Sequence, residues 1–288
     1  ADVVVPWRDN NRVAVDLITH HIRSKLGMHE LLRIFTNLFV MPSTMQTRGM
    51  HTKIRSRETP RQEFSFYADR LIRLVVETAL GHLPFGETEV ITPVGEPYQG
   101  VEFSRRICGV SIIRSGEAME NALRTCCIGV KIGKILIDQV AGKDGKERSL
   151  HVLYEKLPYD IAERHVLLMD PILASGNTCA AAIEVLTKLR NVKEDKIILI
   201  TIIAAAKGIN LVCSRFPGVK VITTEIDEGM DENGIVLPGI GNFGDRYFGT
   251  CCAADEPTRL LTGNLSSMNS ERASDTSTSN GNTGAQSN

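Results

Sequence analysis

The stretch from Val166 to Arg190, VLLMDPILASGNTCAAAIEVLTKLR, constrains this chain most, because it predicts a strand, a short polar loop and a helix in succession. Its first four residues are apolar and are closed by an Asp-Pro pair, which is typical of a strand buried on both faces. Thr178 is a predicted N-cap for the helix. Apolar residues then recur at helical spacing on one stripe, namely Ala182, Ile183, Leu186 and Leu189. A strand, a loop and a helix in this order form the repeating unit of a parallel α/β sheet.

The loop of this unit, DPILASGNT, has the composition of a phosphate site. The first turn of a helix carries unpaired N–H groups and a partial positive charge. Small residues at Ala174, Ser175 and Gly176 let the backbone close around an oxyanion. Asp170, at the carboxyl end of the strand, suits the hydroxyls of a ribose rather than a phosphate. The pairing indicates a ribose 5-phosphate, although the loop alone fits an ordinary strand-to-helix connection equally well.

Two common nucleotide-binding motifs are missing from the sequence. It contains no GxxxxGK[ST] segment, and no GxGxxG follows a predicted strand. Any phosphate site in this chain is therefore neither a P-loop of the usual kind nor a dinucleotide fingerprint.

A second predicted strand, Ile107 to Ile113, is followed by Arg114-Ser115-Gly116. The fork of an arginine side chain suits the oxygens of a diphosphate, although Arg114 could equally cap a helix or form an ion pair. Further apolar strands are predicted at 196–206 and 219–226. Because strands alternate with helices, the pattern predicts a doubly wound, mostly parallel α/β sheet.

Composition narrows the class of protein. With 288 residues, 42% hydrophobic and 23% charged, the chain suits one sizeable globular domain with extensions. A net charge of −1 gives no indication of a nucleic-acid or membrane-surface partner, and no apolar run is long enough to span a bilayer. The seven cysteines lack CxxC spacing and include two adjacent pairs, which favours a reducing, cytoplasmic location.

Three further segments make the chain recognisable: CGVSIIRSGEAMENALRTCC at 108–127, KIGKILI at 131–137 and PGIGNFGDRYFGT at 238–250. Together with the phosphate loop, they resemble the uracil phosphoribosyltransferases of the type I phosphoribosyltransferase family. The phosphoribosyltransferase-like half of uridine kinase-like proteins is similar too. The resemblance runs in register from about His51 to Thr250. It implies a doubly wound sheet with a β-arm hairpin, expected around 132–156, that helps to build a homodimer or homotetramer.

The resemblance also implies a reaction, in which uracil and phosphoribosyl pyrophosphate (PRPP) give UMP and pyrophosphate in pyrimidine salvage. Mg²⁺ is expected to bind with PRPP, and no metal-ligating residue is assigned. Asp170 and Arg114 are the expected catalytic residues. The expected PRPP-binding residues are Arg114, Asp170, Pro171, Ile172, Leu173, Ala174, Ser175, Gly176, Asn177, Thr178 and Asn242. The expected uracil-binding residues are Val236, Gly241, Asn242 and Phe243.

Two positions depart from the pattern of the family. Gln139 stands where many relatives carry an arginine, and Asn242 replaces the usual first acid of a GDxGD segment. Both changes remove charge from the diphosphate–Mg²⁺ end, so an alternative is a catalytically impaired paralogue that binds PRPP or a nucleotide. A third interpretation is a fragment of a bifunctional uridine kinase, whose kinase half would lie outside this chain.

The ends of the chain carry less pattern. We expect an N-terminal helical extension over 1–47, the phosphoribosyltransferase domain over 48–252, and a disordered tail over 263–288, where the composition shifts to Ser, Asn, Thr and Gly. The basic stretch from Arg48 to Arg61 predicts either a solvated face or a phosphate neighbour for an effector such as GTP. A long amphipathic helix is predicted at 65–83, with Leu71, Leu74, Val75 and Thr78 inward, and a hairpin at 90–103.

Overall fold

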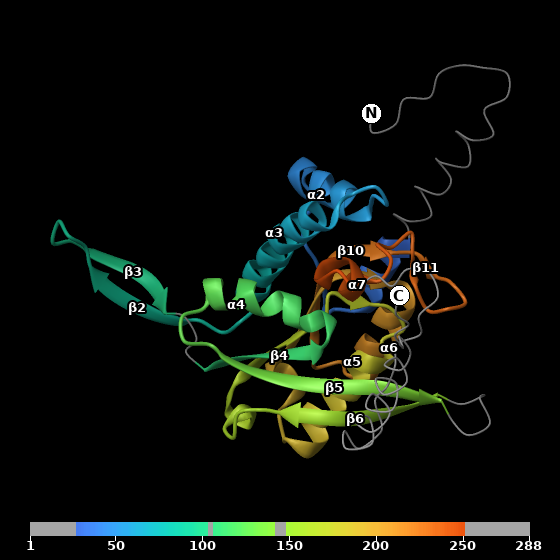
Figure 1. Ribbon diagram of the computed structural model, residues 1–288. Coiled ribbons are helices and arrows are strands. Elements are labelled where there is room, and N and C mark those ends of the chain that lie inside the picture. Colours follow the sequence, from blue (N-terminus) through green and yellow to red (C-terminus); the bar gives the residue numbers. More distant parts are fainter. Residues whose placement is uncertain (1–26, 103–105, 142–147, 251–288) are drawn as a thin grey trace, which may run out of the picture. The chain divides into compact units, whose positions relative to one another are not determined.

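The computed structural model describes residues 27–102, 106–141 and 148–250, and all structural statements below refer to these (Figure 1). The helices are α2 (Met45–Arg55), α3 (Arg61–Leu80), α4 (Glu120–Cys126), α5 (Asn177–Glu184), α6 (Ala206–Arg215) and α7 (Phe243–Phe248). The strands are β1 (Leu38–Val40), β2 (Gly86–Ile91), β3 (Pro97–Glu102), β4 (Ile107–Ile113), β5 (Lys131–Ala141), β6 (Arg148–Lys156), β7 (His165–Met169), β8 (Ile172–Leu173), β9 (Ile197–Ala205), β10 (Lys220–Asp227), β11 (Gly229–Met230) and β12 (Val236–Leu237).

The main sheet is mostly parallel and confirms the predicted fold class. Its strand order is β1-β10-β9-β7-β4-β5-β6, with β8 pairing β9 beside this path. Neighbouring strands are parallel from β1 to β5, and β6 pairs β5 in the antiparallel direction. Strand β7, which contains the apolar run before Asp170, lies in the middle of this order. The loop that follows it therefore lies at the centre of the sheet's carboxyl edge.

Helices cover both faces of this sheet, which explains why its central strands are apolar without alternation. In β7, Val166 and Leu168 join the core with α5 and α6, whereas Leu167 and Met169 join the core with α3 and α4. Side chains of a strand point alternately to opposite faces, and here both faces are buried. Hydrophobic burial on the two faces fixes β7 at the centre of the fold.

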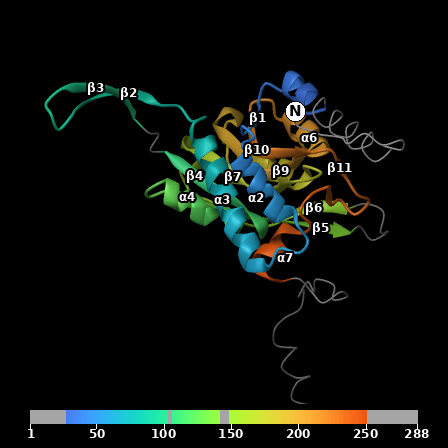
Figure 2. The ribbon, with the colours of Figure 1, turned by 90° about the horizontal axis from the view of Figure 1, so that it is seen from above.

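Two predicted antiparallel hairpins accompany the parallel core, besides the short β11–β12 pair. The strands predicted around 132–156 are β5 and β6, which pair at the edge of the main sheet. The hairpin predicted at 90–103 is confirmed as β2–β3, a separate two-stranded sheet in which Val90 lies opposite Tyr98. Seen from above, this second hairpin extends away from the main sheet (Figure 2). Most of its residues are exposed.

The long amphipathic helix exists as α3, but one predicted inward residue is wrong. Leu71 and Val75 are fully buried, whereas Leu74 is 38% exposed. The buried residues are Phe64, Ala68, Leu71, Ile72, Val75, Val76 and Ala79. At about 100° per residue, Leu74 projects about 120° from the middle of that stripe, which turns it towards solvent.

The helix after the phosphate loop differs from prediction at both ends. Gly176, with a φ of 84°, stands at the N-cap position in place of Thr178, and no side chain caps the helix. Leu189 is 67% exposed, although the helical stripe placed it inward. A π-helical turn follows α5 at Val185–Leu189, where the Arg190 N–H donates to the Val185 carbonyl. The wider turn interrupts the 3.6-residue period and carries Leu189 away from the core.

The N-terminal part of the described chain joins the main fold. Residues 27–34 are helical, and β1 pairs β10 within the stretch expected to be an extension. Helix α2 spans the expected boundary between 47 and 48. The domain boundaries therefore stay a prediction, and the tail predicted at 263–288 lies outside the described residues. Every helix in the described ranges is too short or too polar to cross a bilayer.

Candidate functional site

Asp170 lies directly after β7 at the carboxyl edge of the sheet, and two side chains hold it. The Ser115 hydroxyl donates to its Oδ1 over 3.1 Å, and the Cys179 thiol donates to its Oδ2 over 3.5 Å. Burial raises the pKa of Asp170 to about 6, against the lowering effect of these hydrogen bonds. The carboxylate is thus fixed in orientation and remains mostly ionised at pH 7, as a hydroxyl acceptor requires.

The phosphate loop after Asp170 is anchored at both ends. The Pro171 carbonyl accepts from the Thr201 hydroxyl over 2.9 Å and from backbone N–H groups of β9. Ile172 and Leu173 form β8, and the Leu173 side chain is fully buried, so only its backbone can reach a ligand. Beyond them, Ser175 accepts a hydrogen bond from the Asn177 N–H over 3.4 Å, and both residues retain exposure to solvent.

Two glycines press this loop against the first turn of α6. A Cβ on Gly176 would come within 2.9 Å of the Gly208 carbonyl oxygen, and one on Gly208 within 2.4 Å of the Ala174 carbonyl oxygen. Both distances are too short for a side chain, so the close approach requires glycine. Sequence reasoning missed Gly208, although a glycine just after an apolar strand was the available signal.

Arg114 follows β4 and reaches the C-terminal signature segment. Its Nη2 donates to the Asp245 carboxylate over 2.6 Å, and its Nη1 donates to the Thr250 hydroxyl over 2.7 Å. Thr250 in turn donates to Asp245 over 2.7 Å. Burial raises the pKa of Asp245, but hydrogen bonds from Arg114 and Thr250 outweigh it and hold the pKa below its usual value. Arg114 occupies the N-cap position of the 3-10 helix Ser115–Met119, but its side chain forms the ion pair and makes no capping hydrogen bond. Sequence reasoning identified neither Asp245 nor Thr250 as its partner.

Arg114 and its neighbour Ser115 join the two halves of the site. Ser115 contacts Asp170, whereas Arg114 contacts Asp245. A Cβ on the next residue, Gly116, would lie 2.3 Å from the Met169 carbonyl oxygen, so this turn is pressed against the end of β7. Two adjacent residues therefore tie the predicted phosphate loop to the predicted base-binding segment.

The predicted base-binding segment runs from β12 into α7 through left-handed glycines. Gly239 has a φ of 57°, and a Cβ there would meet the Val236 carbonyl oxygen at 2.0 Å. Gly241 has a φ of 73°. Asn242 caps α7, because its side-chain oxygen accepts from the Asp245 N–H over 3.1 Å. An asparagine is a good N-cap, so the change from the usual acid preserves this local structure.

The ring of Phe243 is buried, so it does not form part of the exposed surface of this segment. The side chain is 3% exposed. Its ring lies 5.7 Å from that of Phe64 and stacks on that of Tyr247 at 5.4 Å. Val236 is likewise buried, with 4% exposure. Any contact between these two residues and a flat ligand therefore runs through peptide groups.

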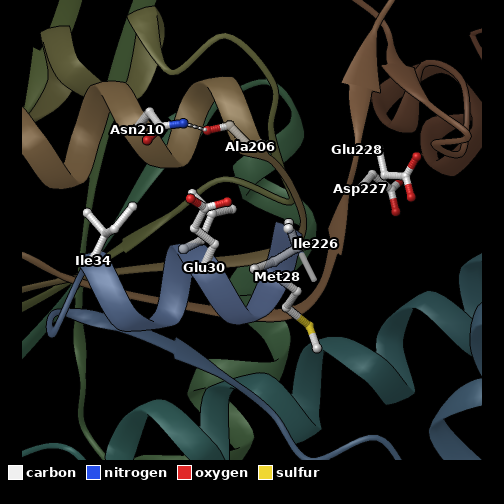
Figure 3. A pocket seen from close by; sticks show the side chains of 10 residues that line it. Met28, Glu30, Ile34, Ala206, Asn210, Ile226, Asp227 and Glu228 are labelled. Atoms are coloured by element: carbon white, nitrogen blue, oxygen red, sulfur yellow. Dashed lines mark hydrogen bonds between the residues drawn. The ribbon is translucent and has the colours of Figure 1, made fainter. Parts of the chain in front are cut away.

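Other candidate features fall outside this site. Gln139 lies in β5 opposite Leu150, but its side chain is outside the described part of the structure. In the same ranges, no group of three or more His, Cys, Asp or Glu side chains is arranged to hold a metal ion. A cavity of about 430 Å³ lies between helix 27–34, α6 and the end of β10 (Figure 3). Its lining contains none of the predicted site residues.

Comparison with known proteins shows what most of this chain is similar to. Residues 40–250 match the model of the uracil phosphoribosyltransferase family. The uracil phosphoribosyltransferase of Dictyostelium discoideum is 50% identical over 214 residues, which cover 74% of this chain and 97% of the relative. Uracil phosphoribosyltransferase 1 of Schizosaccharomyces pombe is 48% identical, with 74% and 95% covered.

Longer proteins match as well. The chloroplastic uridine/cytidine kinase UKL1 of Arabidopsis thaliana is 56% identical over 250 residues, 87% of this chain and 50% of the relative. The chain thus spans about half the length of several curated relatives that it matches. Among solved structures, the AQ2163 protein from Aquifex aeolicus has the same fold, with a TM-score of 0.63, 23% identity, and 73% of this chain and 97% of that chain covered.

Proposed function

Because this chain belongs to the uracil phosphoribosyltransferase family, we propose that it transfers the phosphoribosyl group of PRPP to uracil, forming UMP and pyrophosphate. The observation that carries the proposal is the pair of contacts from adjacent residues, Ser115 to Asp170 and Arg114 to Asp245. A sugar-phosphate loop and a glycine-lined base segment would otherwise be separate features. Their connection supports one pocket in which a ribose and a pyrimidine meet.

In this proposal, the first turn of α5 binds the 5-phosphate with backbone N–H groups and the Ser175 and Thr178 hydroxyls. Asp170 accepts hydrogen bonds from the ribose hydroxyls. Arg114 neutralises charge on the diphosphate as the bond from the anomeric carbon to the leaving oxygen breaks. The uracil nitrogen forms the new bond to that carbon and loses its proton. We assign no residue as the general base.

The base is recognised by backbone groups in this scheme. Uracil presents alternating acceptors and a donor along its edge, and the peptide groups of Val236 and of Gly241 to Phe243 can pair with them. Gly241 has no side chain to cover its backbone, and its φ of 73° is one that favours glycine. Specificity for a pyrimidine would then depend on how rigidly this backbone is held.

Mg²⁺ would bind mainly to PRPP and supply charge neutralisation at the diphosphate. The residues present fit this arrangement, because Mg²⁺ keeps substrate and water ligands and needs few from the protein. Two protein oxygens of the predicted base-binding segment could assist: the Asp245 carboxylate, which accepts from Arg114, and the Asn242 side-chain oxygen, which accepts from the Asp245 N–H. A GTP effector, a homodimer or homotetramer, and a cytoplasmic location remain parts of the proposal.

The alternative is a PRPP- or nucleotide-binding protein with impaired catalysis. Asn242 favours it, because an amide cannot supply the charge of the acid that the family usually carries there. Asn242→Asp provides the matched test, since aspartate also caps helices and preserves the Asp245 contact. If lost charge limits catalysis, Asn242→Asp raises turnover several-fold at subsaturating Mg²⁺–PRPP.

The test of function is conversion of radiolabelled uracil to UMP with PRPP and Mg²⁺. We expect turnover by the parent chain and a loss of at least about 100-fold in Asp170→Asn, which keeps the shape but removes the acceptor charge. PRPP or UMP binding without turnover, in the parent and in Asn242→Asp alike, would refute the enzyme and favour the binding protein. Titration of the same assay with GTP tests the effector.

A further inference from the structure

Arg55, in the last turn of α2, is enclosed by acceptors. Its Nη1 donates to Asp227 Oδ2 over 2.9 Å and its Nη2 to Asp227 Oδ1 over 2.7 Å, a two-pronged pair. Nη2 also donates to Glu225 over 2.7 Å. The Arg55 side chain is 20% exposed and that of Asp227 is 5% exposed. This arginine belongs to the basic stretch predicted as a solvated face or a phosphate neighbour. Its ion pair and low exposure show that Arg55 is not part of a solvated face, and the phosphate neighbour stays a prediction.

The same two residues hold both backbone polar groups of one residue, Gly239, in the predicted base-binding segment. Arg55 Nη1 donates to the Gly239 carbonyl over 3.1 Å, and the Gly239 N–H donates to Asp227 Oδ2 over 2.9 Å. Gly239 lies two residues before Gly241. Its left-handed φ of 57° leaves no room for a side chain against Val236. The backbone that turns towards Gly241 is therefore held from outside the segment.

A second arginine holds the next residue to the same helix. Arg246 Nη1 donates to the Ile240 carbonyl over 2.9 Å and to the Ile54 carbonyl over 2.6 Å. Its Nη2 donates to the Ser56 carbonyl over 2.8 Å. The end of α2 and the residues before Gly241 are thus joined by two guanidinium groups. A segment of four glycines would otherwise gain much backbone freedom.

We propose that Arg55, acting with Asp227, is a positioning residue that sets specificity for the nucleobase by fixing the backbone on both sides of Gly239. The inference rests on the proposed function, since it assigns the held segment to uracil. It predicts that loss of the Arg55–Asp227 pair weakens uracil recognition and spares PRPP binding, because in the described part of the chain neither residue makes a hydrogen bond or ion pair with 170–178.

The test compares Arg55→Lys with a matched control, Arg124→Lys. Both arginines lie in the last turn of a helix, but Arg124 is exposed on α4. Lysine keeps the charge and loses the fork that contacts Asp227 and Gly239 together. We expect KM for uracil to rise about tenfold in Arg55→Lys, with KM for PRPP within about twofold, because small displacements of binding groups weaken recognition strongly. Arg124→Lys should behave as the parent.

Amide hydrogen exchange supplies a readout that needs no turnover. In Arg55→Lys, amides over 236–242 should exchange faster than in the parent. Amides over 170–178 should exchange at the parent's rate, which also shows that the variant is folded. If Arg55→Lys does not fold, Asp227→Asn takes its place, because asparagine is nearly isosteric with aspartate. Asp227→Asn should also raise KM for uracil and speed amide exchange over 236–242.

Two results would overturn the proposal. One is an equal rise in KM for uracil and PRPP; the other is unchanged exchange over 236–242. A parent chain without turnover would refute the proposed function, whereas the exchange comparison still decides whether Arg55 orders the segment.

Discussion

The burial of Asp170 opposes the ionised state that its proposed role in activity requires. It is buried at the end of β7, yet the proposed chemistry requires its charge. Burial raises its pKa to about 6, because the charged form loses its hydration. The hydrogen bonds from Ser115 and Cys179 compensate for only part of the lost hydration. Functional carboxylates often show perturbed pKa values of this kind, at a cost to the folded state.

The first prediction concerns the pH dependence of stability at Asp170. The folded chain binds this proton more tightly than the unfolded chain, so its contribution to the free energy of unfolding is greatest below pH 3.8 and falls as pH rises through about 6. At pH 7, Asp170→Asn should therefore be more stable than the parent by up to about 3 kcal/mol. The gain should shrink towards pH 4. Urea unfolding at pH 4, 5.5 and 7 measures it, and a gain that is independent of pH would contradict it.

The second prediction concerns activity at the same residue. If ionised Asp170 holds the ribose, kcat/KM for PRPP should fall below about pH 6 as a single proton binds. The low residual activity of Asp170→Asn should lack this acidic limb. Rates measured from pH 5 to pH 8 check both profiles. A limb that persists in Asp170→Asn would assign the titration to another group.

At the scale of elements, the site depends on how closely neighbouring elements approach. The phosphate loop touches α6 through Gly176 and Gly208, and the turn after β4 touches the end of β7 through Gly116. The shortest of these contacts are to backbone atoms, which cannot move aside as the end of a side chain can. The geometry of the loop should therefore respond to any added Cβ at the contact.

Gly208→Ala tests this contact against Gly49→Ala. A Cβ at Gly208 would sit 2.4 Å from the Ala174 carbonyl oxygen, whereas one at Gly49, inside α2, meets nothing within 4 Å. We expect Gly208→Ala to destabilise the chain by about 1–3 kcal/mol and to raise KM for PRPP. Gly49→Ala should stabilise it by about 0.5–1 kcal/mol through helix propensity.

Urea unfolding and initial rates measure both variants. Equal stabilities for the two would show that α6 can move away from the loop, and the contact would then have no bearing on the site.

At the scale of the whole molecule, the β2–β3 hairpin contributes no residue to the hydrophobic cores that the described residues form on the two faces of the main sheet. The β2–β3 hairpin forms its own sheet, and it exposes apolar side chains such as Val90 at 49% and Tyr98 at 61%. A two-stranded sheet alone is at best marginally stable in water. A second copy of the chain in the expected homodimer or homotetramer would cover these apolar side chains. This oligomer stays a prediction.

Val90→Asp tests that cover, because it places a charge opposite Tyr98 in the hairpin. If a second copy covers this pair, the variant should sediment as a smaller species than the parent. Ile128→Asp is the control, since Ile128 is fully exposed in a loop after α4. Sedimentation velocity measures all three chains. A monomeric parent, or a Val90→Asp oligomer of unchanged size, would contradict the prediction.

Local pattern determined much of this protein. The apolar run before Asp170, the small-residue loop and the glycine-rich segment before Thr250 predicted a parallel sheet and the two parts of its site. They could do so because strand burial, helix start and left-handed turns depend on neighbouring residues. The errors were local as well, since a π-helical turn after α5 exposed Leu189 and Gly176 replaced Thr178 at the helix start.

Only the tertiary structure decided which distant residues meet. Asp245 and Thr250 pair with Arg114 from more than a hundred residues away, and Arg55 reaches Asp227 and Gly239. Spacing along the chain carries no record of such contacts, because the packing of α2, α7 and the sheet brings them together. Arg55, in a stretch for which the sequence offered a solvated face, lies in a largely buried ion pair for the same reason.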